Sequence, residues 1–177
     1  MKVIFLDIDG VLNSWATGYK ITTEKLQLLN DLIEQTGAKI VISSSWRIGS
    51  KDVNDFLDKN FSKRTFRLDN PNQELIDNIF YKNTIDLTDT FGPSRGDEIQ
   101  RWLNSHEDIE SYVILDDDLD MLDEQLYNFV QTDTYFGLTD REIHLTCLIL
   151  KNKCIPNKIR LNDELYYRYR KKLEDLI

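Results

Sequence analysis

The N-terminal segment constrains the fold most strongly, because an apolar run of strand-forming residues ends abruptly in an acidic turn. Residues 3–6 read Val-Ile-Phe-Leu, and Asp7, Asp9 and Gly10 follow almost directly. A short, uninterrupted apolar run of this kind is typical of a buried central strand. We therefore predict that the chain opens with a central strand of a sheet and that this strand leads Asp7 into a loop.

The next segment has the pattern of a helix followed by a second buried strand. Thr22 and Thr23 are suitable N-caps, apolar residues then recur at helical spacing, and Gly37 marks the helix end. A second predicted buried strand, residues 38–42, is followed by three serines. This order predicts a βαβ unit with parallel strands. The fold class that follows is α/β, with a doubly wound parallel sheet.

The later part of the chain repeats this order of elements. Ser94 is a suitable N-cap for a helix that leads to an apolar strand at 112–115. A short apolar run at 129–131 and a capping box from Thr139 to Glu142 predict one more strand and helix.

The domain organisation is predicted to be simple, with a single domain over residues 1–177. Residues 48–93 are the least regular part, with a short helix near Val53, and we treat them as a candidate small lid insertion. The apolar spacing near the C-terminus predicts a helical extension over residues 155–177.

Charge and cysteine content narrow the class of protein. The formal net charge of −9 disfavours broad, unspecific binding of nucleic acid, because the average surface repels polyanions. Cys147 and Cys154 lack CxxC spacing and are expected to be reduced thiols. The apolar run at residues 3–6 is too short for a signal peptide or a membrane span. We expect a cytoplasmic protein with no membrane partner.

Polar clusters follow three of the predicted strands. They are Asp7-x-Asp9-Gly10, Ser43-Ser44-Ser45 and Asp116-Asp117-Asp118. In an open parallel sheet, ligands bind beyond the carboxyl ends of the strands, so these clusters are expected to converge. Carboxylates crowded into one crevice repel one another unless a cation neutralises them, and an all-oxygen ligand set favours Mg²⁺ over zinc. The predicted cofactor is Mg²⁺.

The spacing of Asp7 and Asp9 suits a division of chemical roles. Strand geometry places residues two apart on the same side, close enough to share one substrate. One aspartate can attack a phosphoryl group to form an aspartyl-phosphate, and the other can protonate the leaving oxygen and then activate water. Gly10 allows the backbone to turn sharply beside the site.

These motifs resemble, in order, those of the haloacid dehalogenase (HAD) superfamily. Asp7-x-Asp9-Gly10-Val11 is similar to motif I, the strand that ends at Ser44 to motif II, and Val113-Ile114-Leu115-Asp116-Asp117 to motif IV. The resemblance spans roughly residues 2–133 and implies a HAD-like Rossmannoid fold.

The same resemblance implies the role of each residue. Asp7 would be the nucleophile, Asp9 the acid/base, and Ser44 a hydrogen-bond donor to a phosphate oxygen. The Mg²⁺ ligands would be Asp7, Asp117 and the backbone carbonyl of Asp9, with Asp116 close by. Haloacid dehalogenases proper lack the second aspartate, so Asp9 indicates a phosphatase.

Two residues are candidates for the motif III cation. In the family, this Lys or Arg lies near the start of the helix before the motif IV strand, and Arg95 fits that place. Its guanidinium suits phosphate and can offset the crowded carboxylates. Arg47 competes for the role, although we favour Arg95. Ser43 and Ser45 likewise remain alternatives to Ser44, while Trp46 is interpreted as a packing residue.

Four segments narrow the resemblance further, to the HAD domain found alone or in Swiss Army Knife RNA-repair proteins. They are Asp7 to Asn13, Ser43 to Arg47, Arg95 to Ile99 and Val113 to Asp118. This branch implies a nucleotide, a nucleic-acid end or another phosphorylated small molecule as substrate.

The function expected is therefore a Mg²⁺-dependent phosphomonoester hydrolase that acts through an aspartyl-phosphate on Asp7. The alternative is a non-catalytic module of the same fold that binds a phosphorylated ligand or partner, and the intact pair of Asp7 and Asp9 favours the enzyme. About nine residues separate Asn13 from the first helix, so minimal or no cap is expected there. The sequence does not indicate an oligomeric state.

Overall fold

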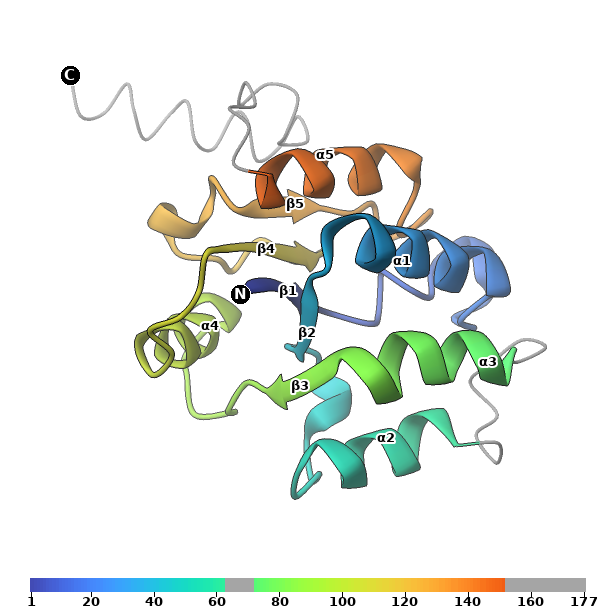
Figure 1. Cartoon of the computed structure of the whole chain (residues 1–177), viewed down its shortest axis with the longest axis horizontal. Coiled ribbons are helices and arrows are strands. Elements are labelled where there is room, and N and C mark those ends of the chain that lie inside the picture. The colour runs from blue at the N-terminus through green and yellow to red at the C-terminus, as the bar shows by residue number, and fades with distance from the viewer. Residues whose placement is uncertain (63–71, 152–177) are drawn as a thin grey trace.

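The strands of the protein form one sheet with helices on both faces (Figure 1). The computed structural model describes residues 1–62 and 72–151. Its sheet has five strands in the order β3-β2-β1-β4-β5, and every neighbouring pair is parallel. The strands are β1 (Lys2–Leu6), β2 (Lys39–Ile42), β3 (Thr84–Leu87), β4 (Ser111–Asp116) and β5 (Phe129–Gln131).

The order of the strands shows where the winding of the sheet reverses. The chain moves outward from β1 through β2 to β3, then crosses to β4 on the other side of β1. This is a doubly wound parallel sheet, which confirms the predicted fold class. The reversal lies between β1 and β4, and crevices at such a point are the usual ligand sites of open α/β sheets.

Helices cover the two faces of the sheet unequally. One face carries α1 (Thr23–Thr36) and α5 (Asp140–Leu150), whose core also takes in α2 (Val53–Phe61) and α3 (Gln73–Ile76). The other face is covered by α4 (Arg95–Asn104). Short helical turns complete the chain: η1 (Trp15–Thr17), η2 (Ser45–Arg47), the π-helical η3 (Asp77–Tyr81) and η4 (Asp123–Gln125).

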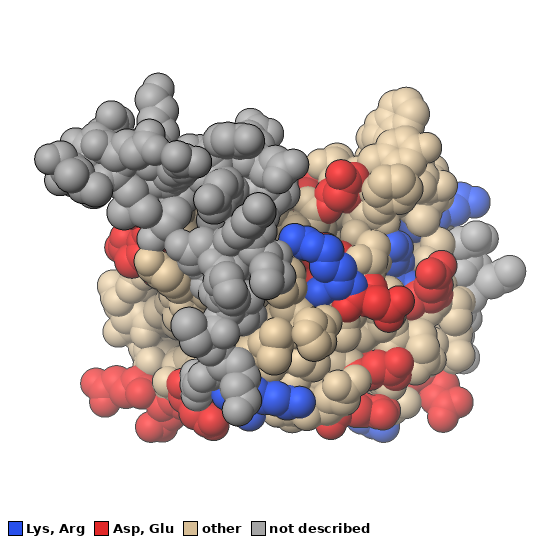
Figure 2. Space-filling view, turned by 90° about the horizontal axis from the view of Figure 1, so that it is seen from above, with Lys and Arg blue, Asp and Glu red and all other residues tan. Residues whose placement is uncertain are grey.

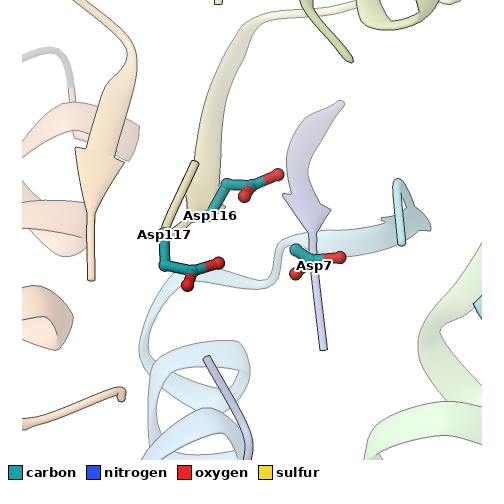
Figure 3. Close-up of side chains that lie close together, drawn as sticks. All are labelled: Asp7, Asp116 and Asp117. Carbon is teal, nitrogen blue, oxygen red and sulfur yellow. The ribbon is translucent and has the colours of Figure 1, made fainter. Parts of the chain in front are cut away.

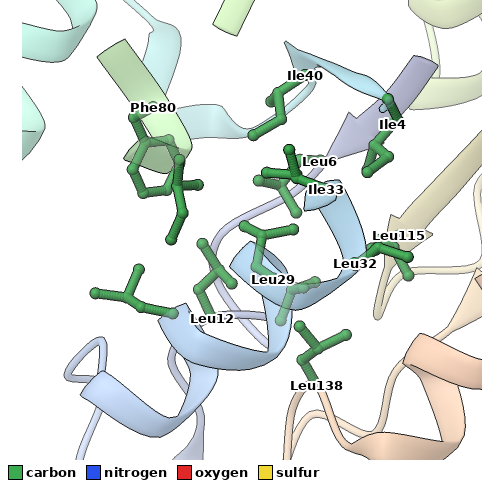
Figure 4. Packing of buried hydrophobic residues seen from close by; sticks show 14 of the residues in the cluster. Ile4, Leu6, Leu12, Leu29, Leu32, Ile33, Ile40, Phe80, Leu115 and Leu138 are labelled. Atoms are coloured by element: carbon green, nitrogen blue, oxygen red, sulfur yellow. The ribbon is translucent and has the colours of Figure 1, made fainter. Parts of the chain in front are cut away.

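The apolar run that opens the sequence serves both faces. Ile4 and Leu6 point into the core beneath α1, where Leu29 and Leu32 pack, as Figure 4 shows. Phe5 points the other way and meets Trp102 of α4 edge to face, with ring centroids 5.3 Å apart. This alternation explains why the run has no polar residue, since both faces of β1 are buried.

The predicted helix caps are confirmed. The Thr22 side chain accepts a hydrogen bond from the backbone N–H of Lys25, and Gly37 ends α1 with a left-handed φ of 66°. Ser94 caps α4, and Thr139 forms the predicted capping box of α5 with Glu142.

Strand β3 and the short helix α3 are elements that the sequence pattern did not reveal. Strand β3 matters more here, because it belongs to the sheet. It lies in the segment considered as a lid, and its residues pair in parallel with β2, with Leu87 opposite Ile42. The strand is short, contains Asp86 and lies at the edge of the sheet, so its hydrophobic signal is weak. Residues 84–87 thus belong to the sheet, while a lid role for the rest of 48–93 stays a prediction.

Two further predictions concern the C-terminal part of the chain. The helical extension over 155–177 and Cys154 lie outside the described residues. Cys147 is a free, buried thiol in α5.

Among the residues that the structure describes, no helix is long and apolar enough to cross a membrane.

Candidate active site

Strand register brings the three predicted polar clusters, which follow β1, β2 and β4, to one edge of the sheet. Leu6 of β1 pairs with Ile42 on one side and Leu115 on the other. The ladder continues one residue further, because the Asp7 N–H donates to the Leu115 carbonyl at 2.9 Å and the Ser43 N–H donates to the Leu6 carbonyl at 2.9 Å. Asp7 therefore lies between the end of β2 and the end of β4.

A cluster of carboxylates occupies this edge. Asp7, Asp116 and Asp117 each offer an oxygen within 4.8 Å of the others. Figure 3 shows Asp116 and Asp117 extending from the end of β4 toward Asp7, which follows β1. Asp7 and Asp116 are only 5% and 1% exposed, and Asp117 is partly buried.

Gly10 makes room for this cluster. Its backbone has a φ of 70°, and a Cβ atom placed there would lie 2.2 Å from the Asp117 carboxylate. The Thr132 hydroxyl donates to the Gly10 carbonyl at 2.8 Å, and the Gln131 amide donates to the Asp117 carbonyl at 2.8 Å. The loops after β1 and β5 thus hold Asp117 in place, and only glycine fits at position 10 without strain.

Arg95 is a cation that pairs with the cluster. Its guanidinium lies 3.8 Å from the Asp7 carboxylate and 3.5 Å from that of Asp116. Because α4 runs from the carboxyl end of β3 back to the start of β4, its first residue, Arg95, lies at this edge. The backbone N–H of Arg95 donates to the Asp120 carboxylate at 2.8 Å, so Asp120 anchors the start of α4, where an acidic group is favourable.

Arg47 has a different environment. Its side chain is 3% exposed and pairs with Glu98 at 2.5 Å. It also donates to the backbone carbonyls of Ser44, Thr88 and Asp89. These bonds tie the loops after β2 and β3 to α4, and they occupy the Arg47 guanidinium, which also acts on Asp7 through its charge.

The three serines after β2 point in different directions. The Ser44 hydroxyl is fully buried and hydrogen-bonds the Asp7 carboxylate. The Ser43 hydroxyl is buried without a hydrogen-bond partner among the described residues, and Ser45 is exposed. Ser44 is therefore the serine that the structure brings to Asp7.

The Asp9 side chain is held apart from the cluster. Its two carboxylate oxygens accept hydrogen bonds from the Asn13 amide at 2.7 Å and from the Trp46 indole N–H at 2.8 Å. Trp46 also stacks on Phe61, with ring centroids 6.5 Å apart. The packing interpretation of Trp46 was incomplete, because a tryptophan ring carries a polar N–H that seeks an acceptor. The contact with Asp9 could have been inferred from the sequence, because Trp46 follows β2 and Asp9 follows β1, which are neighbouring strands.

Burial opposes ionisation of the cluster. It raises the pKa of Asp7 from 3.8 to about 6, although Arg95 and the Ser44 hydrogen bond act in the opposite direction. Burial and the charge of Asp7 raise the pKa of Asp116 well above its ordinary value. Burial also raises the pKa of Asp117, against the hydrogen bond from Thr134. The carboxylates therefore lack sufficient compensating charge.

The residues present fit a divalent cation. Three ionised carboxylates and the guanidinium of Arg95 leave a formal charge of −2 in a small volume. Asp116 Oδ2 is buried and has no hydrogen-bond partner in the described part of the chain, although it forms the ion pair with Arg95 Nε at 3.5 Å. An all-oxygen set with a buried carboxylate oxygen that lacks a hydrogen bond suits a hard cation such as Mg²⁺.

Two cavities flank the site. One, of about 250 Å³, is lined by residues that include Arg47, Ser94, Arg95 and Glu98. The other, of about 290 Å³, lies beside the loop after β5.

Comparison with known proteins gives one match. Residues 3–143 match the family model described as the HAD domain in Swiss Army Knife RNA repair proteins. This range begins one residue inside β1, includes all of β4, and ends within α5. No curated protein and no solved structure matches the chain.

The raised pKa of Asp7 predicts how the stability of the metal-free protein depends on pH. Because protonated Asp7 is favoured in the folded state, its contribution to the free energy of unfolding is fully present below pH 3.8. This contribution is lost as the pH rises through about 6. In EDTA, Asp7→Asn should therefore gain roughly 1–3 kcal/mol relative to the wild type between pH 4 and pH 7. Chemical denaturation at each pH measures this difference.

The matched control is Glu107→Gln, which removes an exposed carboxylate. A stability difference between Asp7→Asn and the wild type that stays constant with pH, or that shrinks toward pH 7, would show that Asp7 is not held in an unfavourable environment.

Proposed function

The chain belongs to the family of HAD domains found in Swiss Army Knife RNA repair proteins, and on that premise we propose that it hydrolyses phosphomonoesters through a covalent intermediate on Asp7. Family membership supports phosphohydrolase-type function. The observation that carries the finer proposal is the placement of Asp7, which is buried between Ser44 and Arg95 while a second aspartate is held apart from it.

The proposed reaction has two displacements at phosphorus. The Asp7 carboxylate attacks the phosphorus atom, the bond to the leaving oxygen breaks, and Asp9 gives its proton to that oxygen. Asp9 then takes a proton from water, whose oxygen attacks the aspartyl-phosphate and releases phosphate with the Asp7 carboxylate restored. The Arg95 guanidinium and the Ser44 hydroxyl would donate to the phosphoryl oxygens during both steps.

The separation of the two aspartates supports these different roles. Asp7 lies in the carboxylate cluster, whereas both Asp9 oxygens accept hydrogen bonds from Asn13 and Trp46. An acid/base must keep one geometry while its proton comes and goes, and two donors on different elements provide this. Asn13 also accepts from the Gly10 N–H at 3.2 Å, so it links Asp9 to the turn that shapes the cluster.

The metal ligands proposed are the carboxylates of Asp7, Asp116 and Asp117, together with the Asp9 backbone carbonyl implied by the family resemblance. The structure supports the three carboxylates by their mutual distances and by the unsatisfied Asp116 oxygen. A bound Mg²⁺ would neutralise charge on the phosphoryl oxygens and on the cluster.

The direct test of the function is the turnover of an aryl phosphate with Mg²⁺. Asp7→Asn should lower kcat by about a thousandfold or more while the protein stays folded, because the nucleophile is lost. Asp9→Asn should be comparably slow, or should accumulate the phospho-enzyme, which intact-protein mass spectrometry detects. Asp31→Asn, on the outside of α1, is the control.

Substantial steady-state turnover by Asp7→Asn would remove the nucleophile assignment. Binding of phosphorylated compounds by a wild type that shows no turnover would support the non-catalytic alternative.

A second prediction concerns the metal. Because the cluster carries excess negative charge, Mg²⁺ should bind the folded state and raise the Tm of the wild type. The free energy of unfolding should increase by RT ln(1 + [Mg²⁺]/Kd). Ca²⁺ should also stabilise the fold but support turnover poorly, since it prefers looser coordination. Asp117→Ala should weaken the thermal shift and the activity together. Activity that survives EDTA would contradict the proposed site.

A third prediction concerns the donor to Asp9. Trp46→Phe keeps an aromatic ring against Phe61 but removes the N–H that binds the Asp9 carboxylate. Because that bond orients the acid, kcat should fall about tenfold for an alkyl phosphate, whose leaving oxygen needs a proton. The loss should be smaller for a nitrophenyl phosphate, whose leaving group needs little protonation. Equal losses on both substrates would mean that Trp46 acts through general packing.

A further inference from the structure

An exposed aromatic cluster lies at the same edge of the sheet as the candidate active site. Trp15, Tyr135 and Phe136 are 63%, 51% and 58% exposed. The rings of Trp15 and Tyr135 are stacked, with centroids 6.3 Å apart and planes 25° apart, and Phe136 meets Tyr135 edge to face at 4.9 Å. Single exposed aromatic residues are common, but a contiguous group of this kind marks a surface that binds something.

Backbone hydrogen bonds fix this cluster beside the carboxylates. The Trp15 N–H donates to the Thr134 carbonyl at 3.3 Å, and the Ala16 N–H donates to the Tyr135 carbonyl at 3.0 Å. The Thr134 side chain hydrogen-bonds the Asp117 carboxylate. Tyr135 is the next residue, and consecutive Cα atoms are about 3.8 Å apart. Tyr135 therefore directly follows the residue that contacts Asp117, a proposed metal ligand.

The loop that carries two of these rings is held in one shape. The Asp133 carboxylate accepts from the N–H groups of Tyr135 at 2.8 Å and Phe136 at 3.1 Å. The Lys25 ammonium donates to the Phe136 carbonyl at 2.7 Å. Gly137 has a φ of 70°, and a Cβ atom there would lie 2.7 Å from the Val11 carbonyl oxygen. Such preorganisation reduces the entropy lost when a ligand binds.

We propose that Trp15 and Tyr135 form a stacking platform for the nucleobase of the substrate whose phosphate reaches Asp7. This inference rests on the proposed phosphatase function and narrows its substrate to a nucleoside phosphate or the terminal nucleotide of a strand. A base is a flat ring system joined to its phosphate through a single sugar, which matches an aromatic platform on the loop whose Thr134 contacts Asp117.

The charge of the protein favours this mode of recognition over a grip on the phosphate backbone. The net charge is −9, and on the face seen in Figure 2 acidic groups are interspersed with a few basic ones among the described residues. Stacking requires no positive surface and accepts any base, because every base has a π-face. We therefore expect one base to be bound, with little preference for its identity.

The test compares two substrates that differ by the base. Adenosine 5′-monophosphate and ribose 5-phosphate are assayed with Mg²⁺, and the ratio of their kcat/KM values is the measured quantity. Trp15→Ala and Tyr135→Ala should each lower this ratio about tenfold. Tyr135→Phe keeps the ring and should restore the ratio.

The matched control is Tyr127→Ala. Tyr127 is 52% exposed, much like Tyr135, but it precedes β5 and so lies at the opposite edge of the sheet. Its loss should leave the ratio unchanged. Equal ratios for the wild type, Trp15→Ala and Tyr135→Ala would overturn the platform while leaving the phosphatase intact.

A binding measurement separates failure of the platform from failure of the function. In the Asp7→Asn protein, adenosine 5′-monophosphate should quench tryptophan fluorescence, and Trp15→Phe in that background should remove most of the quenching. Quenching without turnover in the wild type would support the platform and contradict the phosphatase. If Trp15→Ala instead dissociates a dimer in sedimentation analysis, the cluster is an interface between copies of the chain and the platform is wrong.

Discussion

Electrostatic repulsion among Asp7, Asp116 and Asp117 is the constraint on which the rest of the site depends. Parallel register forces the ends of β1 and β4 together, and Gly10 lets the Asp117 side chain approach where any other residue would collide with it. Arg95 compensates only part of the charge. Holding these charges together for a cation and a phosphoryl group therefore lowers the stability of the fold, which is common at functional sites.

The two aspartates of the first loop show how small differences in position separate chemical roles. Asp7 continues β1 into the buried cluster, whereas Asp9 lies past the strand end and binds two polar donors at the surface. Enzymes often use paired acids whose environments differ in this way. Arg47 and Arg95 divide similarly, since one braces loops through Glu98 and the other faces the carboxylates.

Much of the fold could be predicted because its signals are local. The apolar run at residues 3–6, the cap at Thr22 and the stop at Gly37 each act over a few residues, through strand periodicity or unsatisfied helix ends. The parallel sheet followed from the order of these elements. Strand β3 escaped because an edge strand needs little apolar surface, so its pattern is faint. The convergence of the acidic clusters was likewise foreseeable, since parallel strands share one carboxyl edge.

The sequence by itself therefore determined four of the five strands, the helix caps and the set of acidic residues at one edge. Only the tertiary structure decided which side chains meet there: that Arg95 and not Arg47 faces Asp7, and that Trp46 binds Asp9. It also joined Trp15 to Tyr135, from the loops that follow β1 and β5. Local patterns specify backbone conformation over a few residues, whereas contacts between distant loops depend on strand order, register and helix direction, which exist only in the folded chain.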